Sequence, residues 1–211
     1  MVALEVVRPT VTQLEIGDSL QMQGQALDQD GNVVPGSGLW WSTPDTTVRV
    51  DSLLGWVVPL EPNLTGRVIA RAGTLVSNPT TFSFIARADT LILASAEDVT
   101  VPPEEISSGP IDVRLESFDP IGPLAGRPII FEVIEPVFGD PLDRTVELST
   151  GVLLDTVTTT STGGPSPPVE LRLVAGQPVP DSAVVEIRSF RARGTTPVPG
   201  SGRRVIVRFS P

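Results

Sequence analysis

Oxygen-bearing side chains gather in one short segment, Asp28-Gln-Asp-Gly-Asn32, and side chains of this kind can bind calcium. A calcium EF-hand loop needs oxygen ligands at alternate positions, glycine at position 6 and glutamate at position 12. Counted from Asp28, the glycine falls at position 4 and position 12 is Leu39. An Asp-Gly step between short apolar runs instead favours a hairpin, because glycine supplies the positive φ of the turn. The segment therefore predicts a turn.

Carboxylate pairs could act as the acid and base of a glycosidase, which places two such groups across the bond that is cleaved. The candidate pairs are Glu104-Glu105, Glu132/Glu135 and Asp140/Asp143. We expect all of them in loops or at strand ends of a proline-rich surface, where acidic residues usually face solvent. The sequence therefore predicts no catalytic residue. A weak calcium site that uses Asp51, Glu61 or Asp89 is left open, because carboxylates are plentiful.

Several residue types on which enzyme chemistry depends are missing. The chain has no Cys, no His and no Tyr, and all 15 basic residues are Arg. Zinc and copper sites built on thiolate or imidazole are therefore excluded, and so are His-based triads and Cys or Lys nucleophiles. We expect no enzyme activity, no cofactor and, apart from the weak calcium alternative, no metal site.

Charge is unevenly distributed along the chain, whose net charge is −10. Residues 181–211 carry six Arg against two acidic residues, net +4, and the other 180 residues carry nine Arg against 23 acidic residues, net −14. The acidic body argues against nucleic-acid binding. Four arginines of the basic part could contact an acidic partner or lipid headgroups: Arg191, Arg193, Arg203 and Arg204. The alternative is that these arginines lie on solvated faces of strands.

Short strands are the elements that must position all these residues. Hydrophobic residues make up 40% of the chain, and 19 Gly and 22 Pro interrupt it every few residues, a mixture typical of β-structure. In residues 19–27, apolar or small residues alternate with three glutamines, which predicts a half-buried antiparallel strand. We expect about seven strands before Asp89 and single strands at Leu91–Val101 and Ile111–Phe118 after it. The last of the strands before Asp89, at Thr74–Ala86, is interrupted by Asn78-Pro79, as in an edge strand or bulge.

This spacing predicts an all-β protein with two β-sandwich domains, residues 1–88 and 89–211, each long enough to bury a core. The joint Ile85-Ala-Arg-Ala-Asp89 has no Gly/Ser linker, so we expect a stiff, elongated pair. No apolar run approaches the roughly 20 residues that span a bilayer. Residues 1–9 lack the features of a signal peptide and are typical of a first strand. The protein is therefore cytoplasmic, or its export signal is absent from this sequence.

Five segments of the first half occur in one order: Val11–Asp18, Gln25–Asn32, Trp40–Asp45, Val48–Asp51 and Gly66–Ala72. That order resembles the group 2 bacterial immunoglobulin-like domain, found in invasins, intimins and many surface proteins. The resemblance covers about residues 3–88 and implies an immunoglobulin-like sandwich. One departure is Leu53-Leu54-Gly55-Trp56, where the family usually has a small polar turn before its glycine. This departure predicts an exposed Trp56.

The second half contains Pro123–Glu132, then Thr156–Thr162 with Gly163-Gly164, and then Val174–Pro178 followed by Ala183–Ile187. These segments look like the invasin-type, group 1 bacterial immunoglobulin-like domain, a looser match over about residues 89–211. The insertion Pro136–Arg144 departs from the family. Both families imply adhesion and spacing, and they have no shared catalytic residues to carry over.

The resemblance also gives the tryptophans their expected roles. In the family one Trp of this strand packs between the sheets, and Trp41 stands at that position. Neighbouring side chains of a strand face opposite ways, so Trp40 is expected to point outward. Trp40 and Trp56 then become candidate partner contacts, because exposed aromatic residues often anchor interfaces. The alternative is that a loop of the same domain shields each of them.

Taken together, these features predict a non-enzymatic structural or adhesion module outside the cytoplasm, in the periplasm or at the cell surface, whose partners are proteins. An alternative is an accessory subunit that stabilises a larger membrane-associated assembly, for example an envelope or photosynthetic complex, with peripheral membrane association. A carbohydrate-binding module is the least favoured reading, because binding platforms use several coplanar aromatics and the chain has three Trp and seven Phe.

Overall fold

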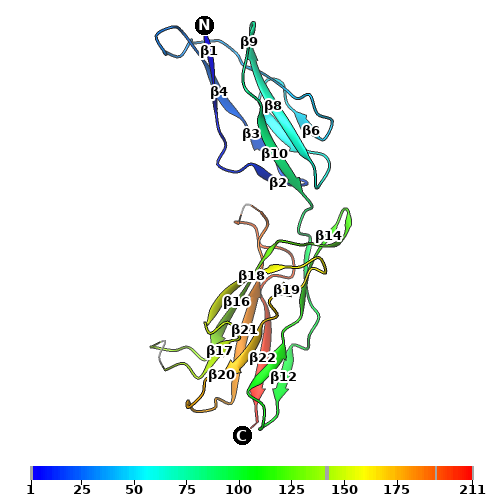
Figure 1. Ribbon diagram of the computed structural model, residues 1–211, viewed down its shortest axis with the longest axis vertical. Helices are drawn as coiled ribbons and strands as arrows, with labels where there is room; N and C mark the ends of the chain where they lie inside the picture. Colours follow the sequence, from blue (N-terminus) through cyan, green and yellow to red (C-terminus); the bar gives the residue numbers. More distant parts are fainter. Residues whose placement is uncertain (1, 141–142, 193, 211) are drawn as a thin grey trace. The chain divides into compact units, whose positions relative to one another are not determined.

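A computed structural model describes residues 2–140, 143–192 and 194–210. These residues form 22 strands, and the chain divides into two compact units, residues 1–87 and 88–211 (Figure 1). The all-β fold predicted from the alternation of apolar and polar residues is confirmed. Within the described ranges no helix has the length and apolar character that a membrane crossing requires.

One layer of the first unit is a mostly antiparallel sheet. Its strands are β2 (Gln13–Glu15), β5 (Trp40–Ser42), β8 (Thr65–Ala72), β9 (Leu75–Val76) and β10 (Thr80–Ile85). They lie in the order β2-β10-β8-β5, and β9 pairs with the end of β8. β2 runs parallel to β10, whereas the other pairs are antiparallel.

The other layer of the first unit consists of two small sheets, β1-β4 and β3-β7-β6. Their strands are β1 (Ala3–Val7), β3 (Leu20–Gln21), β4 (Gln23–Leu27), β6 (Val48–Val50) and β7 (Trp56–Pro59). Met22 alone separates β3 from β4, so the two sheets continue one another. The resulting strand order in the two layers is that of an immunoglobulin-type sandwich.

The core of the first unit lies between these layers and is built by alternate residues of the strands. Its buried members are Leu14, Met22, Trp41, Val48, Val57, Val68, Ala70, Phe82 and Phe84. Gly66 faces core side chains of both layers. A β-carbon on Gly66 would stand 2.7 Å from Val48 Cγ1 and 2.8 Å from the ring of Phe84. The core therefore requires glycine at this position for steric reasons.

The larger layer of the second unit is a six-stranded sheet in the order β12-β22-β21-β16-β18-β19. The strands are β12 (Asp98–Val101), β16 (Pro128–Glu135), β18 (Leu154–Thr159), β19 (Pro165–Ser166), β21 (Ser182–Arg188) and β22 (Arg203–Phe209). β12 and β22 are parallel, and the other neighbours are antiparallel. The second unit thus repeats the parallel pairing of an early and a last strand seen in the first.

The other layer of the second unit consists of two three-stranded sheets, β13-β20-β17 and β11-β14-β15. Its strands are β11 (Thr90–Leu93), β13 (Ser107–Pro110), β14 (Val113–Phe118), β15 (Ile121–Pro123), β17 (Val146–Leu148) and β20 (Glu170–Leu173). Between the layers, Leu115, Phe131 and Ile187 are fully buried. The second unit is therefore also a sandwich with a core of its own.

Two strand predictions for the second unit are wrong in their bounds. The segment Leu91–Val101 is two strands, because the chain passes from one layer to the other: β11 pairs with β14, whereas β12 pairs with β22. The strand predicted at Ile111–Phe118 is β14, which begins two residues later, at Val113, and a separate strand of another sheet, β13, precedes it. Alternation reports which face of a strand is buried, and it does not report to which sheet the strand belongs.

Candidate functional site

The segment 28–32 is a hairpin turn, as its sequence predicts. Leu27 and Val33 form an antiparallel bridge, and Gly31 has a φ of 82°. The Asp28 carboxylate accepts hydrogen bonds from the backbone N–H groups of Asp30 and Asn32, both at 2.9 Å. These bonds, the one from Asn32 first, lower the pKa of Asp28. The carboxylate is therefore used to close its own turn.

Three of the carboxylates considered for catalysis or calcium, Glu132, Asp89 and Asp51, are engaged within their own units. Glu132 lies in the middle of β16 rather than in a loop, a correction to the sequence analysis, and it pairs with Arg188. Asp89 accepts a hydrogen bond from Phe118 N at 2.8 Å. Among the described residues, no three acidic side chains are grouped so that they could hold a metal ion.

The two adjacent tryptophans face opposite ways, as predicted. Trp41 is 5% exposed and belongs to the core, whereas Trp40 is 52% exposed and Trp56 is 40% exposed. Trp40 lies on the outer face of the β5 sheet, and Trp56 on the outer face of the β7 sheet. The structure therefore places the two exposed tryptophans on opposite sides of the first unit.

Each exposed tryptophan lines a separate shallow groove. Trp40 borders a hollow of about 270 Å³ together with Ile69 and Arg71. Trp56 borders one of about 510 Å³ together with Arg49 and Leu53. The two tryptophans therefore do not form one binding platform.

Next to Trp56, the turn formed by residues 51–55 carries two exposed leucines, and we call it the apolar turn. Leu53 is 70% exposed and Leu54 is 58% exposed. The departure from the family pattern at this point predicted an exposed tryptophan. That prediction did not extend to the two leucines of the same four-residue segment, which are exposed at the tip of the turn.

Hydrogen bonds hold the apolar turn in one conformation. Asp51 Oδ1 accepts from the N–H groups of Leu53 at 2.9 Å and Leu54 at 2.7 Å. These two bonds, the one from Leu54 first, lower the pKa of Asp51, so its carboxylate stays charged. Gly55 N donates to Asp51 O at 3.0 Å, and Trp41 N donates to Ser52 O at 2.9 Å. The turn is thereby fixed to the edge of the sheet at β5.

Glycine is required at the end of the apolar turn. Gly55 has a φ of 72°, and a β-carbon there would lie 2.9 Å from Trp41 Nε1. The close approach to the buried indole and the positive φ both select glycine. The core tryptophan therefore supports the turn that exposes Leu53 and Leu54.

The arginines of the C-terminal strands are paired with acidic residues of their own unit. Arg203 lies 3.2 Å from Glu97, and Arg204 lies 3.4 Å from Glu186. Arg191 N donates to Thr196 O at 2.9 Å in the loop after β21. Arg193 lies outside the described residues. The local excess of positive charge is thus partly balanced by neighbouring strands, and a partner role for these arginines stays a prediction.

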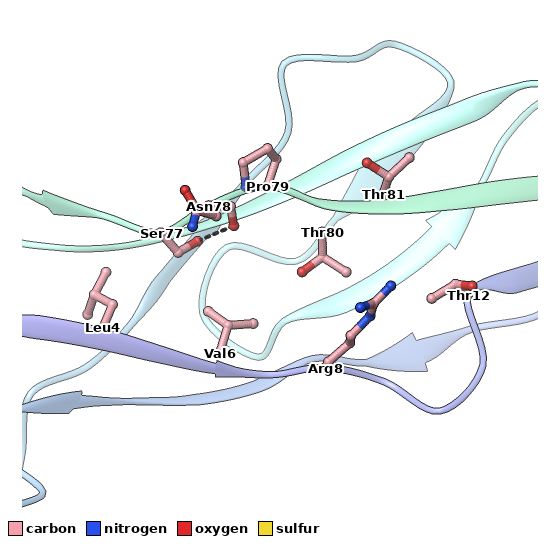
Figure 2. A pocket seen from close by; sticks show the side chains of 9 residues that line it. All are labelled: Leu4, Val6, Arg8, Thr12, Ser77, Asn78, Pro79, Thr80 and Thr81. Carbon is pink, nitrogen blue, oxygen red and sulfur yellow. Dashed lines mark hydrogen bonds between the residues drawn. The ribbon is translucent and has the colours of Figure 1, made fainter.

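A third hollow lies at the other edge of the first unit, and we call it the β1–β10 groove (Figure 2). It has a volume of about 460 Å³. Its lining comes from two segments and one residue between them: Leu4, Val6, Arg8, Thr12, Ser77, Asn78, Pro79, Thr80 and Thr81. The Asn78-Pro79 step, typical of an edge strand, is the one sequence feature that points to this edge, and it does not predict the groove itself.

No protein-family model matches the chain, and no curated protein matches it at a significant level. Among solved structures, domains 4 and 5 of the S-layer protein SbsC are 17% identical with a TM-score of 0.37, and the alignment covers 99% of this chain and 98% of that one. The Yersinia pseudotuberculosis adhesin InvE is 15% identical with a TM-score of 0.42, with 99% and 58% covered.

The Escherichia coli adhesin FdeC is 13% identical with a TM-score of 0.45, and the alignment covers 99% of this chain and 64% of that one. This chain thus spans less than two thirds of the InvE and FdeC chains. These are distant similarities of fold, and the group 2 and group 1 family assignments stay predictions from the sequence motifs.

Proposed function

We propose that this chain is a non-enzymatic module of a bacterial protein, located outside the cytoplasm, that makes protein–protein contacts and holds them at a set spacing. The main contact is the apolar turn with Trp56. Trp40 and the C-terminal arginines are secondary contacts. The extracytoplasmic location and the bacterial source rest on the resemblance of the sequence motifs to surface-protein domains.

The observation that carries the proposal is an apolar surface that the first unit builds rigidly and leaves uncovered. Contiguous exposed apolar groups on soluble domains usually mark interaction sites, and tryptophan is enriched among the residues that anchor interfaces. Leu53 and Trp56 line the same groove, and Arg49 adds a cation at its rim. A turn that is already ordered loses little conformational entropy when a partner covers it. These properties suit a docking surface.

Spacing is supported by the shortness of the joint between the units. Ile85 O accepts from Ile16 N in the first unit, and Asp89 N donates to Glu116 O in the second. Three residues lie between these anchored positions. Four peptide steps reach at most about 14 Å. The joint therefore allows little extension, whatever the orientation of the units.

The contact is tested by placing a photoreactive residue at position 53 in the cell that produces the protein. We expect a crosslinked protein complex at position 53. The same probe at the exposed Glu61, outside the apolar turn, should give none. Trp56→Ser should abolish the crosslink at position 53 without unfolding the unit. Protease added to intact cells or to spheroplasts should reach the chain.

Two results would contradict the proposal. A crosslink that forms equally at positions 53 and 61, or that survives Trp56→Ser, would show that other proteins contact the chain without specifically recognising the apolar turn. Turnover of a substrate by the purified chain would reject the non-enzymatic role outright.

The same surface also suits the alternative role, an accessory subunit of a larger membrane-associated assembly, in which the apolar turn would be covered. Size-exclusion chromatography of the purified chain separates the two roles. A stable monomer favours a free-standing module, whereas a chain that stays soluble only with a partner favours a subunit. Carbohydrate binding is less well supported, because Trp40 and Trp56 lie on opposite outer faces and cannot form one stacking platform.

A further inference from the structure

The first unit leaves a place in one of its sheets where a strand is missing. The chain starts in one layer as β1, which pairs with β4, and crosses to the other layer, where β2 pairs with β10. β2 covers Ser83–Ile85 and does not extend to Thr80–Phe82. On its other side, the same part of β10 pairs with β8. The β1–β10 groove lies at this uncovered stretch of β10.

The backbone of β10 offers hydrogen-bonding groups to the groove. Phe84 N donates to Leu64 O, whereas Ser83 N donates to Thr12 O, so successive residues of β10 face opposite neighbours. By this alternation the N–H and C=O of Thr81 point away from β8 and toward the groove. The N–H donor and the C=O acceptor of Thr81 therefore face the groove from this edge.

The side chains of the groove suit an extended chain in shape and size. Leu4 and Val6 from β1 and Thr80 from β10 point into the gap between the two strands (Figure 2). A strand residue occupies about 160 Å³, given the rise along a strand and the spacings of strands and sheets. The volume of about 460 Å³ therefore accepts about three residues.

The charge of the groove is positive although the chain is acidic overall. Arg8 is the one ionisable residue among the nine that line the groove, and it lies toward the end at which Thr12 begins the approach to β2. Arg8 is exposed and makes no ion pair with the described residues. An acidic side chain in the groove would therefore meet a cation without a competing carboxylate.

We propose that the β1–β10 groove binds an extended segment of a partner protein, which adds a strand to β10 at Thr81 and places a carboxylate at Arg8. Strand addition of this kind draws affinity from main-chain hydrogen bonds and specificity from side-chain pockets. A small apolar side chain of the segment packs on Leu4 and Val6. The proposal deepens the proposed protein-contact function and rests on it for the nature of the partner.

The test uses a synthetic probe, acetyl-Asp-Val-Thr-Val-Asp-amide, which offers a carboxylate to Arg8 in either strand direction. Nuclear magnetic resonance of the ¹⁵N-labelled chain follows its binding. We expect saturable amide shifts at residues 4–8 and 77–81 and slower hydrogen exchange of the Thr81 amide. The matched peptide with Lys in place of both Asp should bind about tenfold more weakly. Shifts elsewhere, or equal affinity for the two peptides, would overturn the proposal.

Two variants test which groups of the groove bind the peptide. Thr81→Pro removes the N–H that faces the groove and no N–H that faces β8, so the sheet keeps its ladder. It should weaken the Asp peptide about fivefold or more. Arg8→Glu exchanges the charge, and should make the Lys peptide the tighter of the two. If Thr81→Pro does not fold, Arg8→Glu still decides, because unchanged peptide preference in that variant rejects the site.

Failure of this proposal is distinguishable from failure of the proposed function. The apolar turn is bonded to β5, at one edge of the sheet, and the groove borders β10, which lies two strands away from β5. Specific crosslinks at position 53 without peptide binding would keep the protein-contact function and reject the groove. Peptide binding without crosslinks at position 53 would keep the groove and reject the apolar turn.

Discussion

At the scale of single residues, Gly55 and Gly66 are positions of the first unit where a β-carbon would lie too close to core side chains. Gly55 lets the apolar turn rest against the indole of Trp41, and Gly66 lets Val48 meet Phe84. Gly38 differs from both, because a β-carbon there would have no neighbour within 4 Å. Some positions of the first unit therefore have no room for a β-carbon and require glycine, whereas Gly38 has room for one.

The substitution Gly66→Ala tests this requirement. The added methyl group would overlap Val48 and Phe84, so we expect the free energy of unfolding of the first unit to fall by about 1–3 kcal/mol. Gly38→Ala is the matched control and should change it by less than about 0.5 kcal/mol. Chemical denaturation of the two variants and the parent chain measures the difference. Equal stability of both variants would mean that the layers separate easily at Gly66.

At the scale of elements, the outer face of the six-stranded sheet is organised by charge. Glu132 on β16 stands directly opposite Glu186 on β21, and Glu186 stands opposite Arg204 on β22. Like charges in direct register destabilise a strand pair. Arg188 contacts both glutamates and offsets this repulsion. Arg188 therefore contributes more to the pairing of β16 with β21 than an isolated surface ion pair would.

The substitution Arg188→Ala should expose the repulsion between Glu132 and Glu186. We expect the free energy of unfolding of the second unit to fall by about 1 kcal/mol at low salt, with the loss shrinking near 1 M salt as the charges are screened. Arg208→Ala, which breaks an exposed pair with Asp98, should cost clearly less than Arg188→Ala, because solvent screens that pair. Denaturation at two salt concentrations measures both. A salt-independent loss would assign the role of Arg188 to packing.

The sequence predicted the strands better than their pairing. Alternation predicted the positions of most strands, and the family resemblance predicted that Trp41 lies in the core, because both depend on which side chains are buried. Alternation did not predict the split of Leu91–Val101 into β11 and β12, because a segment that passes from one sheet to another keeps the same alternation in both. The β1–β10 groove was not predicted for the same reason, because it arises where β1 and β2 belong to different layers.

At the scale of the whole molecule, the joint of three residues is the feature on which the spacing proposal depends. The chain contains no Cys, so two introduced cysteines can carry spin labels without interference. We expect labels at the exposed residues Glu61 and Glu104 to report a narrow distance distribution by electron–electron resonance. Four Gly/Ser residues inserted between Arg87 and Ala88 should broaden it and leave both unfolding midpoints unchanged. An equally broad distribution in the parent chain would reject a spacing role.

The parallel pairing of an early strand with the last one has a mechanical consequence for each unit. A pull that enters through β2 and leaves through β10 drags these strands past each other lengthwise, because they point the same way. All hydrogen bonds of the ladder then carry the load together, instead of opening one after another as in a zipper. The pairing of β12 with β22 repeats the arrangement. A tether built from such units would resist tension up to a threshold and then give way abruptly.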